Sequence, residues 1–224
     1  MCHTSCALFN AGNLASYLSV IEAWLSRPAN AREILTLLLV NSNDLGANQF
    51  GKSFTDAGLQ NYTFQPASNP NALAFRDWPT LQQMIDAGTR LVVFMDSQAD
   101  VTTVPYILPE WDYFFETPYD VTNASSLDQG CPLDRPANTQ PDGKMYIVNH
   151  FLDETAAFLL GATVPDIDLL PQTNAATGFG SIGNQVQSCE QIYEQPPKFV
   201  LVDFYDKGDV FVAEKKMNGV SSPN

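Results

Sequence analysis

Apolar and polar residues follow one another along this chain in blocks, and the blocks have two different periods. Nearly continuous apolar runs, such as 34–40 and 90–95, are typical of strands buried on both faces of a parallel sheet. Between the runs, apolar residues recur every three or four positions, which is the spacing of an amphipathic helix. The pattern predicts strands over 34–40, 90–95, 145–148 and 199–202, weaker strands over 62–64 and 113–116, and helices over 13–25, 50–57, 77–88, 182–193 and 210–218.

Helices and strands alternate in this prediction, which is the order of a parallel α/β fold. Two long polar segments, 120–143 and 166–180, are expected to be loops. No shift in composition divides the 224 residues, so we expect a single domain over 1–224. The predicted strands are too few to close a TIM-type (β/α)8 barrel.

Polar side chains follow the predicted strands at the point where each strand ends. In parallel α/β folds these carboxyl ends form the rim or crevice that binds ligands. The candidates for substrate binding at this edge are Asn41, Asp96, Asn149, His150 and Tyr205, with Asp203 as a candidate catalytic group.

Two of these candidates have competing interpretations. A carboxylate at Asp203 is costly in an apolar setting unless it is paired, so it could orient an imidazole, bind a substrate hydroxyl or serve as a structural partner. His150 could contact substrate at the rim, cap the next helix or form hydrogen bonds within the core.

The first six residues hold His3 between Cys2 and Cys6. An imidazole titrates near neutral pH and suits general acid–base catalysis, although His3 could equally be a surface residue in a disulfide-bonded loop. The spacing is not that of a zinc site, and we predict no metal. Four cysteines allow three pairings, of which we prefer Cys2–Cys6 with Cys131–Cys189.

The charge balance is strongly acidic, with 11 Lys and Arg against 25 Asp and Glu and a net charge of −14. Such a surface disfavours nucleic acid and anionic membranes as partners. No apolar run predicts a transmembrane segment, and no signal peptide is recognised. The acceptor sequons at Asn61 and Asn123, with the even cysteine count, nevertheless indicate a secreted or cell-surface lineage. No Gly-rich phosphate motif follows a strand, so we expect no nucleotide cofactor.

Several stretches together match a known pattern: Cys2–Cys6, Leu37–Asn41, Trp78–Asp96, Val104–Leu108, Glu116–Val121, Val148–Asp153 and Phe199–Tyr205. Through them the chain resembles the secreted, fungal-type phosphodiesterases related to the catalytic domain of phosphatidylinositol-specific phospholipase C. The resemblance implies a TIM-type barrel of lipid metabolism, in which two histidines act as general base and general acid without a metal ion. It implies a small phosphodiester or an inositol phospholipid as substrate.

Carried over residue by residue, His3 matches the second histidine, which is the acid, and Asp203 matches the carboxylate that partners the first. The first histidine lies in a Gly-Thr-His motif that this chain does not contain. We therefore expect an incomplete TIM (β/α)8-type barrel, with the first one or two strands missing and activity lost or impaired. One alternative is a non-catalytic secreted barrel that binds a glycan or phospho-sugar. A metal-dependent glycerophosphodiester phosphodiesterase is disfavoured, because the strand ends are richer in Asn than in Glu.

Overall fold

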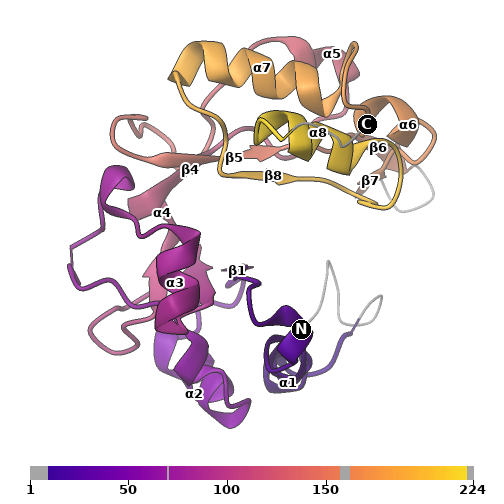
Figure 1. Cartoon of the computed structure of the whole chain (residues 1–224). Coiled ribbons are helices and arrows are strands. Elements are labelled where there is room, and N and C mark those ends of the chain that lie inside the picture. The colour runs from indigo at the N-terminus through magenta and orange to yellow at the C-terminus, as the bar shows by residue number, and fades with distance from the viewer. Residues whose placement is uncertain (1–9, 70, 157–161, 221–224) are drawn as a thin grey trace. The chain divides into compact units, whose positions relative to one another are not determined.

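The computed structural model describes residues 10–69, 71–156 and 162–220, and these form two compact units, Met1–Tyr113 (unit 1) and Phe114–Asn224 (unit 2) (Figure 1). Cys2, His3 and Cys6 lie outside the described residues. No described helix is long and apolar enough to cross a bilayer. The expectation of one domain over the whole chain stays a prediction.

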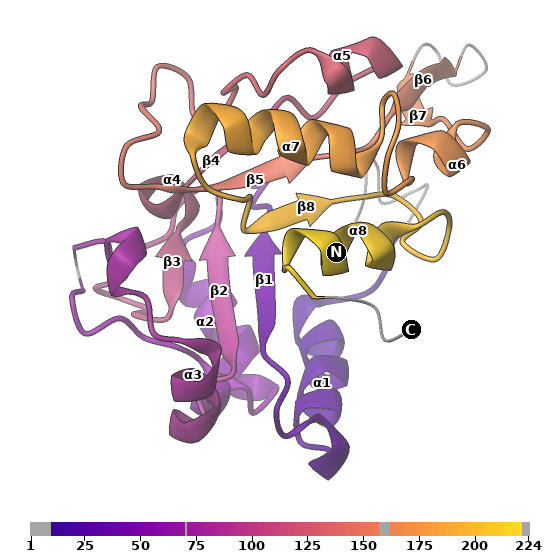
Figure 2. The same ribbon diagram turned by 45° about the horizontal axis from the view of Figure 1, so that its top comes forward.

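Unit 1 is built on a parallel sheet in the order β1–β2–β3, whose strands run side by side in one direction (Figure 2). β2 is buried at every position, as expected for the central strand of such a sheet. Its core includes Leu18 and Leu25 on one helix, Phe54 on another, and Leu91 and Val93 on β2. The elements of unit 1 are α1 (Leu14–Leu25), η1 (Pro28–Asn30), β1 (Leu35–Leu39), α2 (Ala47–Asp56), η2 (Gln60–Tyr62), η3 (Phe75–Asp77), α3 (Leu81–Ala87), β2 (Leu91–Met95), β3 (Ile107–Pro109) and α4 (Glu110–Tyr113).

Local signals place the helix ends of unit 1. The side chain of Asn13 accepts a hydrogen bond from the Ser16 amide and caps α1. Thr80 and Gln83 form a capping box at the start of α3, and Gly88 ends that helix in the left-handed region at φ 75°. The predicted start of α2 was too late, because the helix begins at Ala47.

Unit 2 contains a second parallel sheet, in the order β4–β5–β8, and a two-stranded antiparallel hairpin of β6 and β7. The rings of Phe115 and Tyr146 stack with their centroids 5.3 Å apart in its core. The Cys131–Cys189 disulfide forms as we preferred, and both half-cystines pack into the same cluster. The elements of unit 2 are β4 (Phe114–Glu116), α5 (Ala124–Asp128), β5 (Met145–Asn149), β6 (Asp153–Ala156), β7 (Ala162–Pro165), α6 (Leu170–Thr173), α7 (Ile182–Tyr193), β8 (Phe199–Leu201) and α8 (Val210–Met217).

The α/β class with parallel sheets is confirmed, but the finer prediction of an incomplete TIM barrel is not. The described residues form two separate three-stranded parallel sheets and contain no closed barrel. The two segments predicted as loops also contain the short helices α5 and α6. Among the weak strands, 113–116 is β4, whereas 62–64 contributes only an isolated bridge between Thr63 and Leu91.

Candidate functional site

The predicted substrate-binding residues and Asp203 all lie in the described part of the chain, at or shortly after strand ends, and within unit 1 two of them meet. One carboxylate oxygen of Asp96 accepts a hydrogen bond from the backbone amide of Asn41 at 2.8 Å. The Asn41 side chain donates to the carbonyls of Leu45, at 2.9 Å, and Ser97, at 3.1 Å, and accepts from the Leu45 amide. Asn41 is buried, and it braces the loops that follow β1 and β2.

Asn149 ends β5 in unit 2, and its hydrogen-bond donors are also engaged. Its amide nitrogen donates to the Glu116 carboxylate at 3.1 Å and to the Thr117 carbonyl at 2.8 Å. Its backbone N–H donates to the Thr117 hydroxyl at 2.9 Å. These bonds tie the carboxyl end of β5 to that of β4.

Glu116 and Arg135 form a partly buried ion pair that sequence analysis missed. Glu116 is buried at the end of β4, where a carboxylate needs a charged or hydrogen-bonding partner. The Arg135 guanidinium also lies over the Tyr119 ring, 4.2 Å from its centroid. The position of Glu116 after an apolar run was a signal for a partner, but nothing local in the sequence pointed to Arg135.

His150 follows Asn149, and its ring is completely buried. Its Nε2 lies 2.7 Å from the Thr173 carbonyl, and its Nδ1 lies 2.5 Å from the Gln185 side chain. A carbonyl can only accept, so Nε2 carries the proton. Burial lowers the pKa of His150, which favours the neutral ring. In the neutral ring Nδ1 accepts a hydrogen bond, so the side-chain amide of Gln185 must be turned by a half-turn to present its nitrogen instead of its oxygen.

Of the three interpretations of His150, hydrogen bonding within the core therefore describes its environment in the structure. Both ring nitrogens contact groups on or beside α6 and α7. A substrate-binding role for His150 stays a prediction, and it requires the side chain to leave these partners.

Asp203 follows β8, and its position is set by Asn174. The Asn174 amide nitrogen donates to the carbonyls of Asp203, at 2.9 Å, and of Phe204 and Lys207, each at 3.3 Å. Gly208 packs directly against Asn174 at φ 71°, where an added Cβ would lie 2.7 Å from the Asn174 Cβ. One buried asparagine thus holds the loop that carries Asp203.

Asp203 belongs to an acidic group at this end of unit 2. The pKa of Asp153 is raised, first by burial and then by the nearby carboxylates of Asp203 and Asp120. Asp153 lies at the start of β6, and its backbone amide donates to the Val121 carbonyl at 2.8 Å. Carboxylates so placed can accept hydrogen bonds from ligand hydroxyls or hold an imidazole in one orientation. Among the described residues, no three His, Cys, Asp or Glu side chains form a group that could hold a metal ion.

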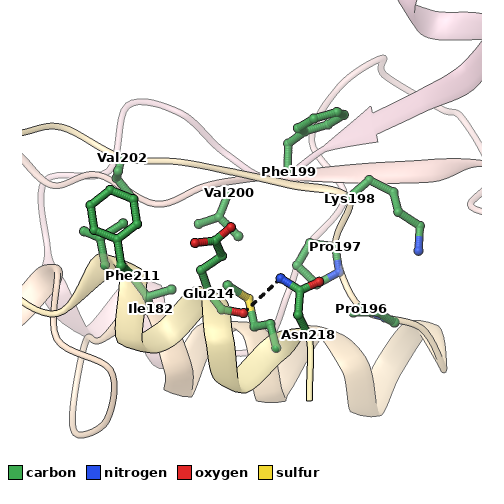
Figure 3. Close-up of a pocket in the computed structure, with 12 residues that line it drawn as sticks. Ile182, Pro196, Pro197, Lys198, Phe199, Val200, Val202, Phe211, Glu214 and Asn218 are labelled. Carbon is green, nitrogen blue, oxygen red and sulfur yellow. Dashed lines mark hydrogen bonds between the residues drawn. The ribbon is translucent and has the colours of Figure 1, made fainter. Parts of the chain in front are cut away.

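Tyr205 is exposed, and its ring meets that of Phe211 edge-on at a centroid distance of 6.2 Å. Phe211 in turn lines a groove of about 440 Å³ between β8 and α8 (Figure 3). The walls are largely apolar, and the Asn218 amide donates to the Glu214 carbonyl at one side. Among the described residues, none of the site residues predicted from the sequence lines this groove. Residue periodicity carries no signal for a hollow between elements, so sequence analysis did not find it.

Comparison with known proteins defines the family. The sequence model of the family described as PI-PLC X 1 matches residues 1–218. The chain belongs to the PI-PLC X domain family. The resemblance drawn from the sequence motifs is thereby confirmed.

Three curated relatives support this assignment. The chain is 46% identical over 221 residues to PI-PLC X domain-containing protein 1 of Arthroderma benhamiae, covering 98% of this chain and 69% of the relative. It is 37% identical over 230 residues to an uncharacterized secreted protein of the same fungus, covering 99% of this chain and 50% of the relative. It is 28% identical over 238 residues to a PI-PLC X domain-containing protein of Arabidopsis thaliana, covering 98% of this chain and 49% of the relative. The chain thus spans about half the length of the last two proteins, and no solved structure matches it.

Proposed function

We propose that this chain derives from a phosphoric diester hydrolase of the phosphatidylinositol phospholipase C type, which cleaves its substrate by general acid–base catalysis. The observation that carries the proposal is the family match over residues 1–218, which includes both His3 and Asp203. A substrate hydroxyl attacks phosphorus and loses its proton to a base, while an acid protonates the departing oxygen. We assign the acid to His3, and we assign Asp203 the task of orienting an imidazole base.

The histidines of the chain limit what it can do alone. His3 and His150 are its two histidines, and both ring nitrogens of His150 are engaged inside unit 2. His3 is therefore the single imidazole proposed to transfer a proton. We expect slow turnover by the 224-residue chain, and we expect added imidazole to accelerate it by acting as the second group.

The charge of the chain bears on the form of the substrate. A net charge of −14 opposes adsorption to an anionic bilayer. A dissolved or dispersed phosphodiester is therefore the favoured substrate, in preference to a lipid packed in an anionic membrane.

The test uses a water-soluble inositol phosphodiester and the 224-residue chain, with folding checked by circular dichroism. Phosphorus NMR follows formation of the cyclic phosphate with and without imidazole. We expect slow cyclisation that imidazole accelerates. His3→Ala should abolish the slow cyclisation, Asp203→Asn should remove the acceleration by imidazole, and Asn61→Gln should leave both unchanged. Turnover that persists in His3→Ala without added imidazole would refute the assignment of the acid.

A calorimetric titration with the same ligand separates the alternatives. Binding without turnover, even with imidazole present, would favour a non-catalytic module that binds a glycan or phospho-sugar. Turnover that a chelator removes would instead indicate metal-dependent chemistry.

A further inference from the structure

A pocket of about 410 Å³ with both polar and apolar lining lies in unit 2 beside α5. Its volume is within the usual range for sites that bind small molecules. Pro118 and Pro132 supply apolar surface, while Ser126, Gln129 and Gln185 supply hydrogen-bonding groups. Gln185 is only 3% exposed, and its amide also contacts the ring of His150.

Asn123, the acceptor of the second sequon, lines the same pocket. It is exposed, and its Oδ1 accepts two hydrogen bonds from Ser125, one from the backbone amide at 3.0 Å and one from the hydroxyl at 2.9 Å. Within the described part of the chain, Nδ2 of Asn123 has no hydrogen-bond partner. The atom that carries a sugar in N-glycosylation is therefore unengaged, while the other atom of the amide fixes the side chain.

We propose that Asn123 carries an N-linked glycan and that the first sugar of this glycan occupies the pocket. The donor is an oligosaccharide linked to a lipid through pyrophosphate, which a cellular transferase delivers. The bond from Nδ2 to the sugar C1 forms as the bond from C1 to the pyrophosphate oxygen breaks, and the amide loses one proton. Oδ1 is unchanged in this reaction, so both bonds from Ser125 can persist in the product.

The pocket chemistry favours a neutral polyhydroxylated group. Asp120 is the one charged residue that lines the pocket, and its carboxylate would repel a phosphate. Hydroxyl and amide side chains can pair with the hydroxyl and acetamido groups of an N-acetylhexosamine. The proline rings can cover its apolar face. A sugar in the pocket would also exclude water from the part of the pocket that Gln185 lines.

Asn61 provides a matched control within the same chain. It is exposed in η2 of unit 1, whereas the pocket that Asn123 lines belongs to unit 2. Any effect of the Asn123 glycan on unit 2 should therefore be independent of the Asn61 sequon.

The test expresses the chain behind a secretory leader in a fungal host and trims each glycan to its first sugar with an endoglycosidase. Ser125→Ala removes both the acceptor motif and the hydroxyl bond to Asn123, so it shows only that modification needs the motif, whereas Ser125→Thr retains the motif and the hydroxyl. Mass spectrometry identifies the occupied asparagines. Hydrogen–deuterium exchange then compares peptides over 118–132 in Ser125→Thr with its single sugars, in the same variant produced without glycans in the bacterial periplasm, and in Asn61→Gln from the fungal host.

We expect a single sugar on Asn123 in Ser125→Thr and none in Ser125→Ala. Exchange over 118–132 should be roughly fivefold slower with the sugar, equivalent to about 1 kcal/mol, which is the net worth of one hydrogen bond. Asn61→Gln should not alter this difference. An unmodified Asn123, or equal exchange with and without the sugar, would overturn the proposal.

Discussion

Removal of the Cys131–Cys189 disulfide should destabilise unit 2 by an amount that the chain topology sets. The bond closes a loop with a sequence separation of 58 residues. The loop-closure model gives about 4 kcal/mol for a loop of that length, through the entropy that the unfolded chain regains. The free energy of unfolding of a small domain is about 5–15 kcal/mol, so this loss would remove much of the stability of unit 2.

The assay must report on unit 2 itself. All three tryptophans, Trp24, Trp78 and Trp111, lie in unit 1, so tryptophan fluorescence is not the appropriate probe. Native-state hydrogen exchange in α7 and β5 measures opening free energies at elements next to the bond. We expect the double variant Cys131→Ala/Cys189→Ala to lose about 4 kcal/mol of protection there.

Two controls make this prediction decisive. A reductant should reproduce the loss in the unaltered chain, and it should add nothing in the double variant, where Cys2 and Cys6 are still present. A loss of protection below about 1 kcal/mol in α7 would refute the loop-closure reasoning.

Three further predictions concern unit 2. Gly183→Ala should lower the free energy of unfolding of unit 2 by roughly 1–3 kcal/mol in urea, because the new Cβ would lie 2.2 Å from the Ala176 carbonyl oxygen. A gain in stability, as Gly→Ala gives at an exposed helix position, would contradict this. Burial lowers the folded pKa of His150, so stability should fall as pH drops below about 6.5. In thermal unfolding, the melting temperature of His150→Gln should decline less steeply with falling pH than that of the unaltered chain, and an equally steep decline would contradict this. The folded pKa of Asp153 is raised, so its ionisation opposes folding at neutral pH. Asp153→Asn should then raise the melting temperature at pH 7, with the gain vanishing as pH falls towards 4, and equal gains at both pH values would exclude this cause.

The secondary structure was largely predictable because its signals are local. Helix α7 has the predicted bounds, since Ser181 caps its start and the apolar spacing continues to Tyr193. The four strong apolar runs all contain strands. β3 was missed because three residues that end in a proline carry too little pattern, and the hairpin of β6 and β7 was missed for a similar reason.

Side-chain environments at the strand ends were much less predictable. The apolar run before His150 showed that a strand ends there, but not that the ring turns towards Gln185. Likewise, Glu116 and Arg135 are brought together by a loop whose path no residue pattern encodes. The motif resemblance found the family because it uses many short stretches at once, whereas the partners of each site residue depend on long-range packing.

The packing of the loop after β8 predicts a pattern of paired substitutions in related sequences. Asn174 reaches across 29 positions to hold the Asp203 carbonyl, and it leaves no room for a side chain at Gly208. A substitution at Asn174 changes the packing that requires glycine at position 208, and if Gly208 is replaced, Asn174 can no longer keep its place. In related sequences the two residues should therefore covary, and their joint loss would mark lineages in which Asp203 is no longer held in place.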